Sequence, residues 1–104
     1  MYIEYFTDRD EEQAYKTISV DIDESAAIGV LISKLHEISK TPLYSELKLN
    51  NKNVTKVPCR YYFLNKEEDY EKIRDLERKI NEFPLSSPNG RLRIYLNNFS
   101  GLVN

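Results

Sequence analysis

The residues that could perform acid–base or nucleophilic chemistry are few in this sequence. It has one histidine, His36, and one cysteine, Cys59. A histidine pair for a metal needs a second imidazole, and a cysteine nucleophile needs a base beside it. We interpret His36 as a partly exposed residue near the end of a helix, and Cys59 as a small core residue in a strand. The sequence therefore predicts no catalytic residue.

Motifs that bind ligands are missing as well. A lone cysteine cannot form an internal disulfide or a thiolate cluster. With three glycines in the chain, no glycine-rich loop can surround a phosphate. The acidic residues 8–12 lack the central glycine and the terminal glutamate of an EF-hand loop. We expect no cofactor and no metal.

Two short segments near the N-terminus, residues 8–12 and residues 21–24, are rich in acidic side chains. Both segments are predicted at the ends of regular elements, where charged side chains are solvated. Carboxylates in such places can face the basic cleft of a nuclease. The electrostatic contact residues predicted on this ground are Asp8, Asp10, Glu11, Glu12, Asp21 and Asp23.

Tyrosine occurs eight times and supplies rigid, amphipathic contact surface. The segment VPCRYYFLN, residues 57–65, places three aromatics directly after an arginine. Because side chains alternate between the two faces of a strand, Arg60 and Tyr62 would share the open face of a sheet. We predict aromatic anchors of a protein contact at Tyr44, Tyr62 and Tyr95.

Composition limits the class of protein. The length of 104 residues predicts one folded domain over residues 1–104. The net charge of -2 disfavours a dedicated nucleic-acid module, because such modules carry an excess of basic residues. Residues 97–104 are expected to be a loose tail. Residues 1–5 lack the pattern of a secretion signal, and no apolar run reaches spanning length. We therefore expect a cytoplasmic protein without membrane contact.

Hydrophobic periodicity predicts seven elements. Strands are expected at residues 2–6, 15–22, 43–49, 54–64 and 92–96, and helices at residues 23–40 and 65–83. Pro42 ends the first helix, and residues 50–53 are typical of a hairpin loop. Asn65 followed by Glu68 resembles a capping box that would start the second helix.

The order β-β-α-β-β-α-β predicts an α+β fold, with two helices on one face of an antiparallel sheet. This arrangement is ferredoxin-like (split βαβ) with an extra N-terminal strand, and a helix-flanked meander is the alternative. The expected core is Ile28, Leu31, Leu35, Ile73, Leu76 and Ile80 against Ile18, Val20, Leu47, Leu92 and Ile94. RNA-recognition domains share the topology, but residues 56–63 lack the glycine of their Lys/Arg-Gly-aromatic pattern.

These features predict a protein-binding domain that is not an enzyme. We expect a stoichiometric inhibitor of another macromolecule, such as a toxin-neutralising immunity protein (antitoxin) or a phage-encoded inhibitor, with a basic nuclease or toxin as partner. One alternative is a nucleic-acid module that uses Arg60, Tyr62, Arg91, Arg93 and Tyr95 on an open sheet face. Another is an orphan enzyme or a small subunit of a complex. The oligomeric state is left open, because an outer strand can pair with a second copy.

Overall fold

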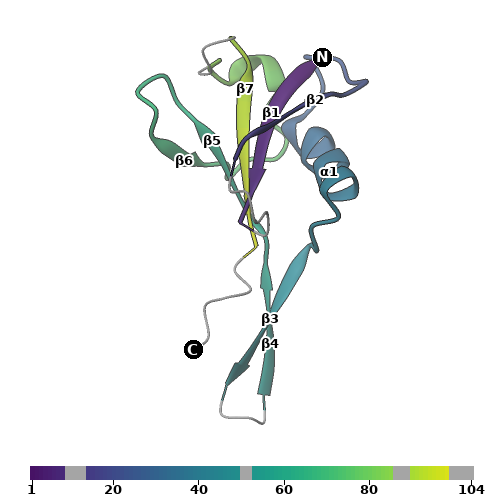
Figure 1. The fold of residues 1–104 in the computed structure, drawn as a ribbon, viewed down its shortest axis with the longest axis vertical. Coiled ribbons are helices and arrows are strands. Elements are labelled where there is room, and N and C mark those ends of the chain that lie inside the picture. Colours follow the sequence, from purple (N-terminus) through teal and green to yellow (C-terminus); the bar gives the residue numbers. More distant parts are fainter. Residues whose placement is uncertain (9–13, 50–52, 86–89, 99–104) are drawn as a thin grey trace.

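The computed structural model describes residues 1–8, 14–49, 53–85 and 90–98, and these form a five-stranded sheet, one α-helix and a separate two-stranded sheet (Figure 1). In chain order the elements are β1 (Tyr2–Thr7), β2 (Lys16–Ser19), α1 (Ile28–Ser39), β3 (Tyr44–Leu49), β4 (Asn53–Pro58), β5 (Arg60–Leu64), β6 (Tyr70–Lys72), the short 3-10 helix η1 (Ile80–Glu82) and β7 (Leu92–Asn97). The prediction of two helices on a ferredoxin-like antiparallel sheet is therefore wrong.

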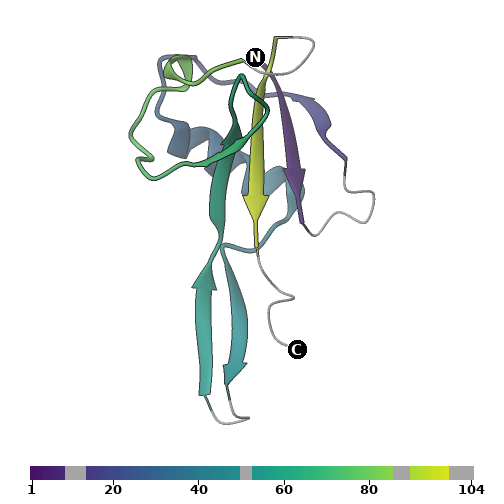
Figure 2. The ribbon, with the colours of Figure 1, turned by 90° about the vertical axis from the view of Figure 1, so that its left-hand side faces the viewer.

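The five-stranded sheet has the order β2-β1-β7-β5-β6. β1 and β7 pair in parallel, with Ile3 opposite Leu92 and Tyr5 opposite Ile94. The other neighbouring strands pair antiparallel, which makes the sheet mixed. β1 and β7 thus lie side by side in the body of the molecule, although they are far apart in sequence (Figure 2). The expectation of a purely antiparallel sheet fails because periodicity does not encode which strands become neighbours.

One face of this sheet packs against α1. Alternate residues of the central strands and residues three or four apart on the helix point toward each other, as the two periodicities require. Their buried side chains are Ile3, Tyr5, Ile28, Leu31, Ile32, Leu35, Leu92, Ile94 and Leu96. Burial of each large side chain contributes about 1.5–3 kcal/mol. Most of the predicted core is confirmed; Ile18 is half-buried, and the side chain of Leu47 lies outside the described residues.

The predicted second helix at residues 65–83 is wrong. The Asn65 Oδ1 atom accepts hydrogen bonds from the backbone N–H groups of Glu67, at 3.0 Å, and Asp69, at 2.9 Å. Glu68 has a positive φ of 63°, so these residues form a tight hairpin turn between β5 and β6. After β6 the chain is irregular until η1, and Leu76, which was expected in the core, is 41% exposed. An Asn side chain can cap a helix or close a turn, and here it closes a turn.

α1 begins later than predicted, at Ile28 instead of at residues 23–25. Asp23 Oδ1 accepts hydrogen bonds from the N–H and Oγ of Ser25, both at 2.8 Å, and these hydrogen bonds hold the pKa of Asp23 below its usual value. The first helical N–H groups are capped by backbone: Ile28 N donates to Arg78 O at 2.7 Å, and Gly29 N to Leu76 O at 2.9 Å. The irregular segment that replaced the second helix thus caps the first.

The predicted strand at residues 54–64 is divided at Cys59. β4 ends at Pro58, whose ring leaves no N–H for a sheet ladder, and β5 starts at Arg60. β4 pairs with β3, with Tyr44 opposite Pro58, whereas β5 pairs with β7 in the main sheet. β3 and β4 form a projection that we call the arm (Figure 1).

The predicted loose tail is wrong at its first two residues. Asn97 is the last residue of β7 and is 6% exposed, and Asn98 is 1% exposed. The rest of the predicted tail, residues 99–104, lies outside the described residues.

The close contact between α1 and Leu76 can be tested with Gly29→Ala. A Cβ atom at Gly29 would lie 3.0 Å from the carbonyl oxygen and 3.2 Å from the Cβ of Leu76. Overpacking of this kind costs about 1–3 kcal/mol, which exceeds the gain of about 1 kcal/mol in helix propensity. We expect a lower free energy of unfolding in urea, and a change within about 0.5 kcal/mol for Glu37→Ala, an exposed control on the same helix. A more stable Gly29→Ala variant would contradict the contact.

Candidate functional site

The sheet face opposite α1 carries a cluster of aromatic rings, which we call the aromatic face. The register places Tyr62 of β5, Tyr95 of β7 and Phe6 of β1 side by side across three strands. The ring centre of Tyr95 lies 5.7 Å from that of Tyr62, 5.2 Å from that of Phe6 and 5.4 Å from that of Tyr70. Two of the predicted anchors, Tyr62 and Tyr95, therefore belong to one cluster.

Two tyrosines close the aromatic face from opposite edges of the sheet. Tyr15 precedes β2 at one edge, Tyr70 belongs to β6 at the other, and their hydroxyl oxygens are 2.7 Å apart. The Tyr15 ring also packs on Phe6, at 5.8 Å between centres. Burial raises the pKa of Tyr15 and of Tyr95, so both hydroxyls keep their protons at neutral pH. Phe6, Tyr15 and Tyr70 could not be predicted as members of this cluster, because only the pairing of the strands brings them together.

Arginines share the aromatic face, as the nucleic-acid alternative requires. Arg93 lies beneath Tyr15, with the guanidinium carbon 5.0 Å from the ring centre, and its Nε atom is 3.3 Å from Glu4 Oε1. Both side chains of this ion pair are largely buried, so the positive charge of Arg93 is compensated inside the protein. Arg91 lies over Tyr2, at 5.5 Å, and Arg60 pairs opposite Asn97. The aromatic face therefore combines aromatic rings with arginines, and the carboxylate of Glu4 lies among them.

The predicted acidic contacts do not form one surface. Asp8 follows β1, and its Oδ1 accepts the backbone N–H of Asn98 at 2.9 Å. Asp21 and Asp23 follow β2, which runs antiparallel to β1, and therefore lie at the other end of that strand pair. Asp23 holds the turn before α1. The remaining predicted residues, Asp10, Glu11 and Glu12, lie outside the described residues.

The root of the arm is fixed by three consecutive carbonyl groups. The carbonyl of Thr41 faces His36 Nδ1 at 2.8 Å, and that of Leu43 accepts the backbone N–H of Cys59 at 2.8 Å. Between them, the carbonyl of Pro42 accepts a hydrogen bond from the Asn98 side chain. The three donors come from α1, from the junction of β4 and β5, and from the residue after β7. The arm is thus anchored to α1 and to the residue after β7, and the bond between Cys59 and Leu43 closes its base.

His36 is buried, at 7% exposed, so the prediction of a partly exposed residue is wrong. A carbonyl can only accept, so Nδ1 donates to Thr41, and Nε2 lies within hydrogen-bond distance of the Tyr61 hydroxyl oxygen, at 2.8 Å. Burial is the main cause that raises the pKa of Tyr61 to about 12, so this hydroxyl retains its proton. Both ring nitrogens are engaged in holding the fold. Cys59 is a buried core residue, as predicted.

Tyr44, the third predicted anchor, lies apart from the other two. It is 55% exposed at the start of the arm, next to Leu43, which is 57% exposed. Its proximity to Tyr61 contributes to the raised pKa of that residue, and Tyr61 belongs to the helix side of the sheet. The structure therefore separates the arm root from the aromatic face.

The described residues contain neither a candidate metal site nor a helix that could span a membrane. Among them, no group of three or more His, Cys, Asp or Glu side chains is placed to hold a metal ion. Neither α1 nor η1 is long and apolar enough to cross a bilayer. Comparison of the whole chain with protein-family models, with curated proteins and with solved structures found no match.

The clamp at the arm root can be tested with Asn98→Ala. Loss of the side-chain donor leaves the Pro42 carbonyl without this bond, which costs about 1–3 kcal/mol of unfolding free energy. We also expect faster hydrogen–deuterium exchange of the Cys59 amide, because its bond to Leu43 closes the same root. Asn81→Ala, at an exposed position, is the control and should leave both quantities unchanged. Equal Cys59 exchange in the Asn98→Ala variant and the natural protein would contradict the clamp.

Proposed function

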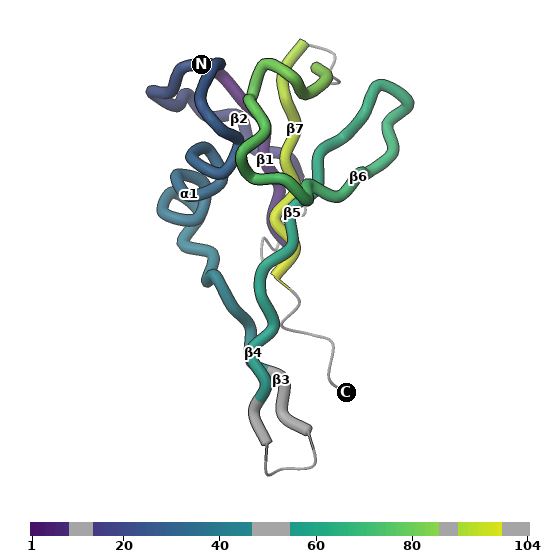
Figure 3. Tube along the Cα trace, turned by 180° about the vertical axis from the view of Figure 1, so that it is seen from behind, coloured from purple at the N-terminus to yellow at the C-terminus, as the bar shows by residue number. Residues whose placement is uncertain are grey.

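We propose that this chain is a protein-binding domain that acts by stoichiometric contact and inhibits another macromolecule. The observation that carries the proposal is the arm, which projects from the body in views turned by 90° and by 180° (Figures 1, 2 and 3). The molecule measures 46 Å along its longest axis and 27 by 24 Å across it. Within the described residues, β3 and β4 pair only with each other. A projection of this form is suited to contact with another molecule.

The physics of the arm supports a binding role. A two-stranded sheet alone in water is marginally stable, because it has no layer to cover either face. The hydrogen bonds to Thr41, Pro42 and Leu43 nevertheless fix its root. An element that is already held in place loses less conformational entropy on binding. A partner that covers the arm would supply the missing layer.

The side chains at the arm root support the same role. Leu43 and Tyr44 are adjacent, large and more than half exposed. Tyrosine is enriched among the residues that dominate binding energy in protein interfaces. His36 has both ring nitrogens engaged with Thr41 and Tyr61, which favours a contact function over a catalytic one.

The proposal includes the kind of inhibitor and its location. A toxin-neutralising immunity protein or a phage-encoded inhibitor acts by the one-to-one contact that the arm is suited to make. A basic partner stays a prediction, since Asp8 and Asp23 each use a carboxylate oxygen to hold the fold. A cytoplasmic location belongs to the same proposal and agrees with a single cysteine, which cannot form an internal disulfide.

The arm can be tested by capture from the host lysate with a tagged chain. We expect a protein partner that survives nuclease treatment and forms a one-to-one complex in native mass spectrometry. Leu43→Ala combined with Tyr44→Ala should weaken that complex by about tenfold or more, because two exposed anchors are lost. Leu85→Ala, at a position 56% exposed outside the arm, is the matched control. Equal recovery with the arm variant and the control would refute a role of the arm root.

A nucleic-acid role is the second candidate, because Arg60, Tyr62 and Tyr95 share one face. The ion pair between Arg93 and Glu4 weighs against it, since it compensates a cation in the middle of that face. This candidate predicts that a single-stranded oligonucleotide binds at low salt and dissociates steeply as salt rises. Tyr62→Ala should then weaken binding, and Lys34→Ala on α1 should not. No gel shift at low salt would exclude this role.

A further inference from the structure

The last strand in the sheet order, β6, offers a backbone edge to a partner. Among the described residues no strand pairs with its outer side, and its three residues are exposed. Ile73 N donates to Tyr61 O at 2.8 Å, so the ladder with β5 continues past β6. In an antiparallel ladder, alternate residues direct their N–H and C=O groups to the same neighbour. The backbone N–H and C=O groups of Glu71 and Ile73 are directed toward β5. Those of Tyr70 and Lys72 therefore point outward, away from the sheet.

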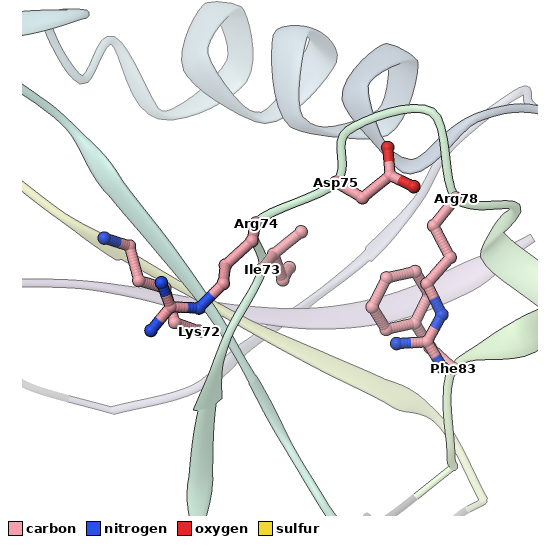
Figure 4. Close-up of a pocket in the computed structure, with 6 residues that line it drawn as sticks. All are labelled: Lys72, Ile73, Arg74, Asp75, Arg78 and Phe83. Carbon is pink, nitrogen blue, oxygen red and sulfur yellow. The ribbon is translucent and has the colours of Figure 1, made fainter.

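A pocket of about 180 Å³ opens where β6 ends. Its lining residues are Lys72, Ile73, Arg74, Asp75, Arg78 and Phe83. Figure 4 shows the Ile73 side chain turned toward Arg78 and Phe83, with Lys72 and Arg74 extending on the other side of the strand. Ile73 and Phe83 are each 5% exposed, and the Arg78 guanidinium carbon lies 4.3 Å from the Phe83 ring centre. The strand end thus has an apolar side and a cationic side.

The cationic side is available for a partner. Within the described ranges, the side chains of Lys72 and Arg74 have no hydrogen-bond or ion-pair partner. Arg78, by contrast, donates to the Glu82 carbonyl at 2.9 Å, and Asp75 accepts the Glu77 N–H at 3.0 Å. The pocket lining holds three cations and one carboxylate, in a chain whose net charge is -2. A second copy paired on this edge would bring like charges together, which is unfavourable.

We propose that the outer edge of β6 binds an extended segment of the partner protein in which acidic and apolar residues alternate. The inference rests on the proposed protein-binding function and names what the partner presents. Such a segment would pair with the outward backbone groups of Tyr70 and Lys72, as in β-strand addition. Its side chains would alternate between the two faces. Acidic ones meet Lys72 and Arg74, and apolar ones enter the pocket over Ile73 and Phe83.

The test is a titration of the full isotope-labelled chain with a short blocked peptide that alternates glutamate and leucine, followed by NMR. We expect amide shifts centred on Tyr70, Lys72 and Arg74. Arg74→Glu should weaken binding by about tenfold, because attraction becomes repulsion. Lys66→Glu is the matched control, since this exposed cation in the β5–β6 turn does not line the pocket and its reversal should leave the affinity unchanged.

Two further peptides make the result decisive. A peptide that alternates lysine and leucine should not bind, and N-methylation of the positions that pair with β6 should abolish binding of the glutamate peptide. Equal binding of the lysine peptide, or shifts outside this edge, would overturn the inference. If a partner is captured through the arm but resists Arg74→Glu, the inference fails and the proposed function stands. If the glutamate peptide binds as expected and no protein partner is captured, the proposed function fails and the peptide site stands.

Discussion

The parallel pairing of β1 with β7 is the interaction on which the rest of the structure depends. It aligns Ile3 with Leu92 and Tyr5 with Ile94, which forms the apolar floor against α1. On the opposite face the same register sets Glu4 beside Arg93, which form a buried ion pair. One register therefore determines the core and the aromatic face together, since a slip by one residue would exchange the two faces of a strand.

The same pairing also determines where the arm is held. Parallel strands end at the same edge of a sheet, so Asp8 after β1 meets Asn98 after β7. Asn98 in turn donates to Pro42, between α1 and the arm. A residue that charge pattern alone assigns to partner contact thus serves to anchor a projection. Because one carboxylate oxygen of Asp8 is used in this way, its substitution would change the arm root as well as the surface charge.

Local patterns predicted the elements well where a single periodicity dominated. The strand predicted at residues 92–96 and the end of the first helix near Ser39 are confirmed. Lys40 ends this helix in a left-handed conformation before Pro42. The prediction failed where one residue serves two local structures. Asn65 suits a helix cap and a hairpin turn equally, and the turn is selected because Ile73 then pairs with Tyr61. Of the five rings in the aromatic face, side-chain alternation predicted Tyr62 and Tyr95, but it did not predict Phe6, Tyr15 and Tyr70.

By itself, the sequence determined the helix that ends at Ser39, the first and last strands, and the faces on which Tyr62, Tyr95 and the arginines stand. Side-chain alternation and helical spacing are local properties, so they survive without knowledge of the neighbours. Only the tertiary structure decided that β1 lies beside β7, that the chain divides at Cys59 to form the arm, and that His36 is buried against Tyr61. The physical reason is that backbone hydrogen bonds are alike in every strand. Which strands meet is therefore settled by the joint burial of side chains distant in sequence.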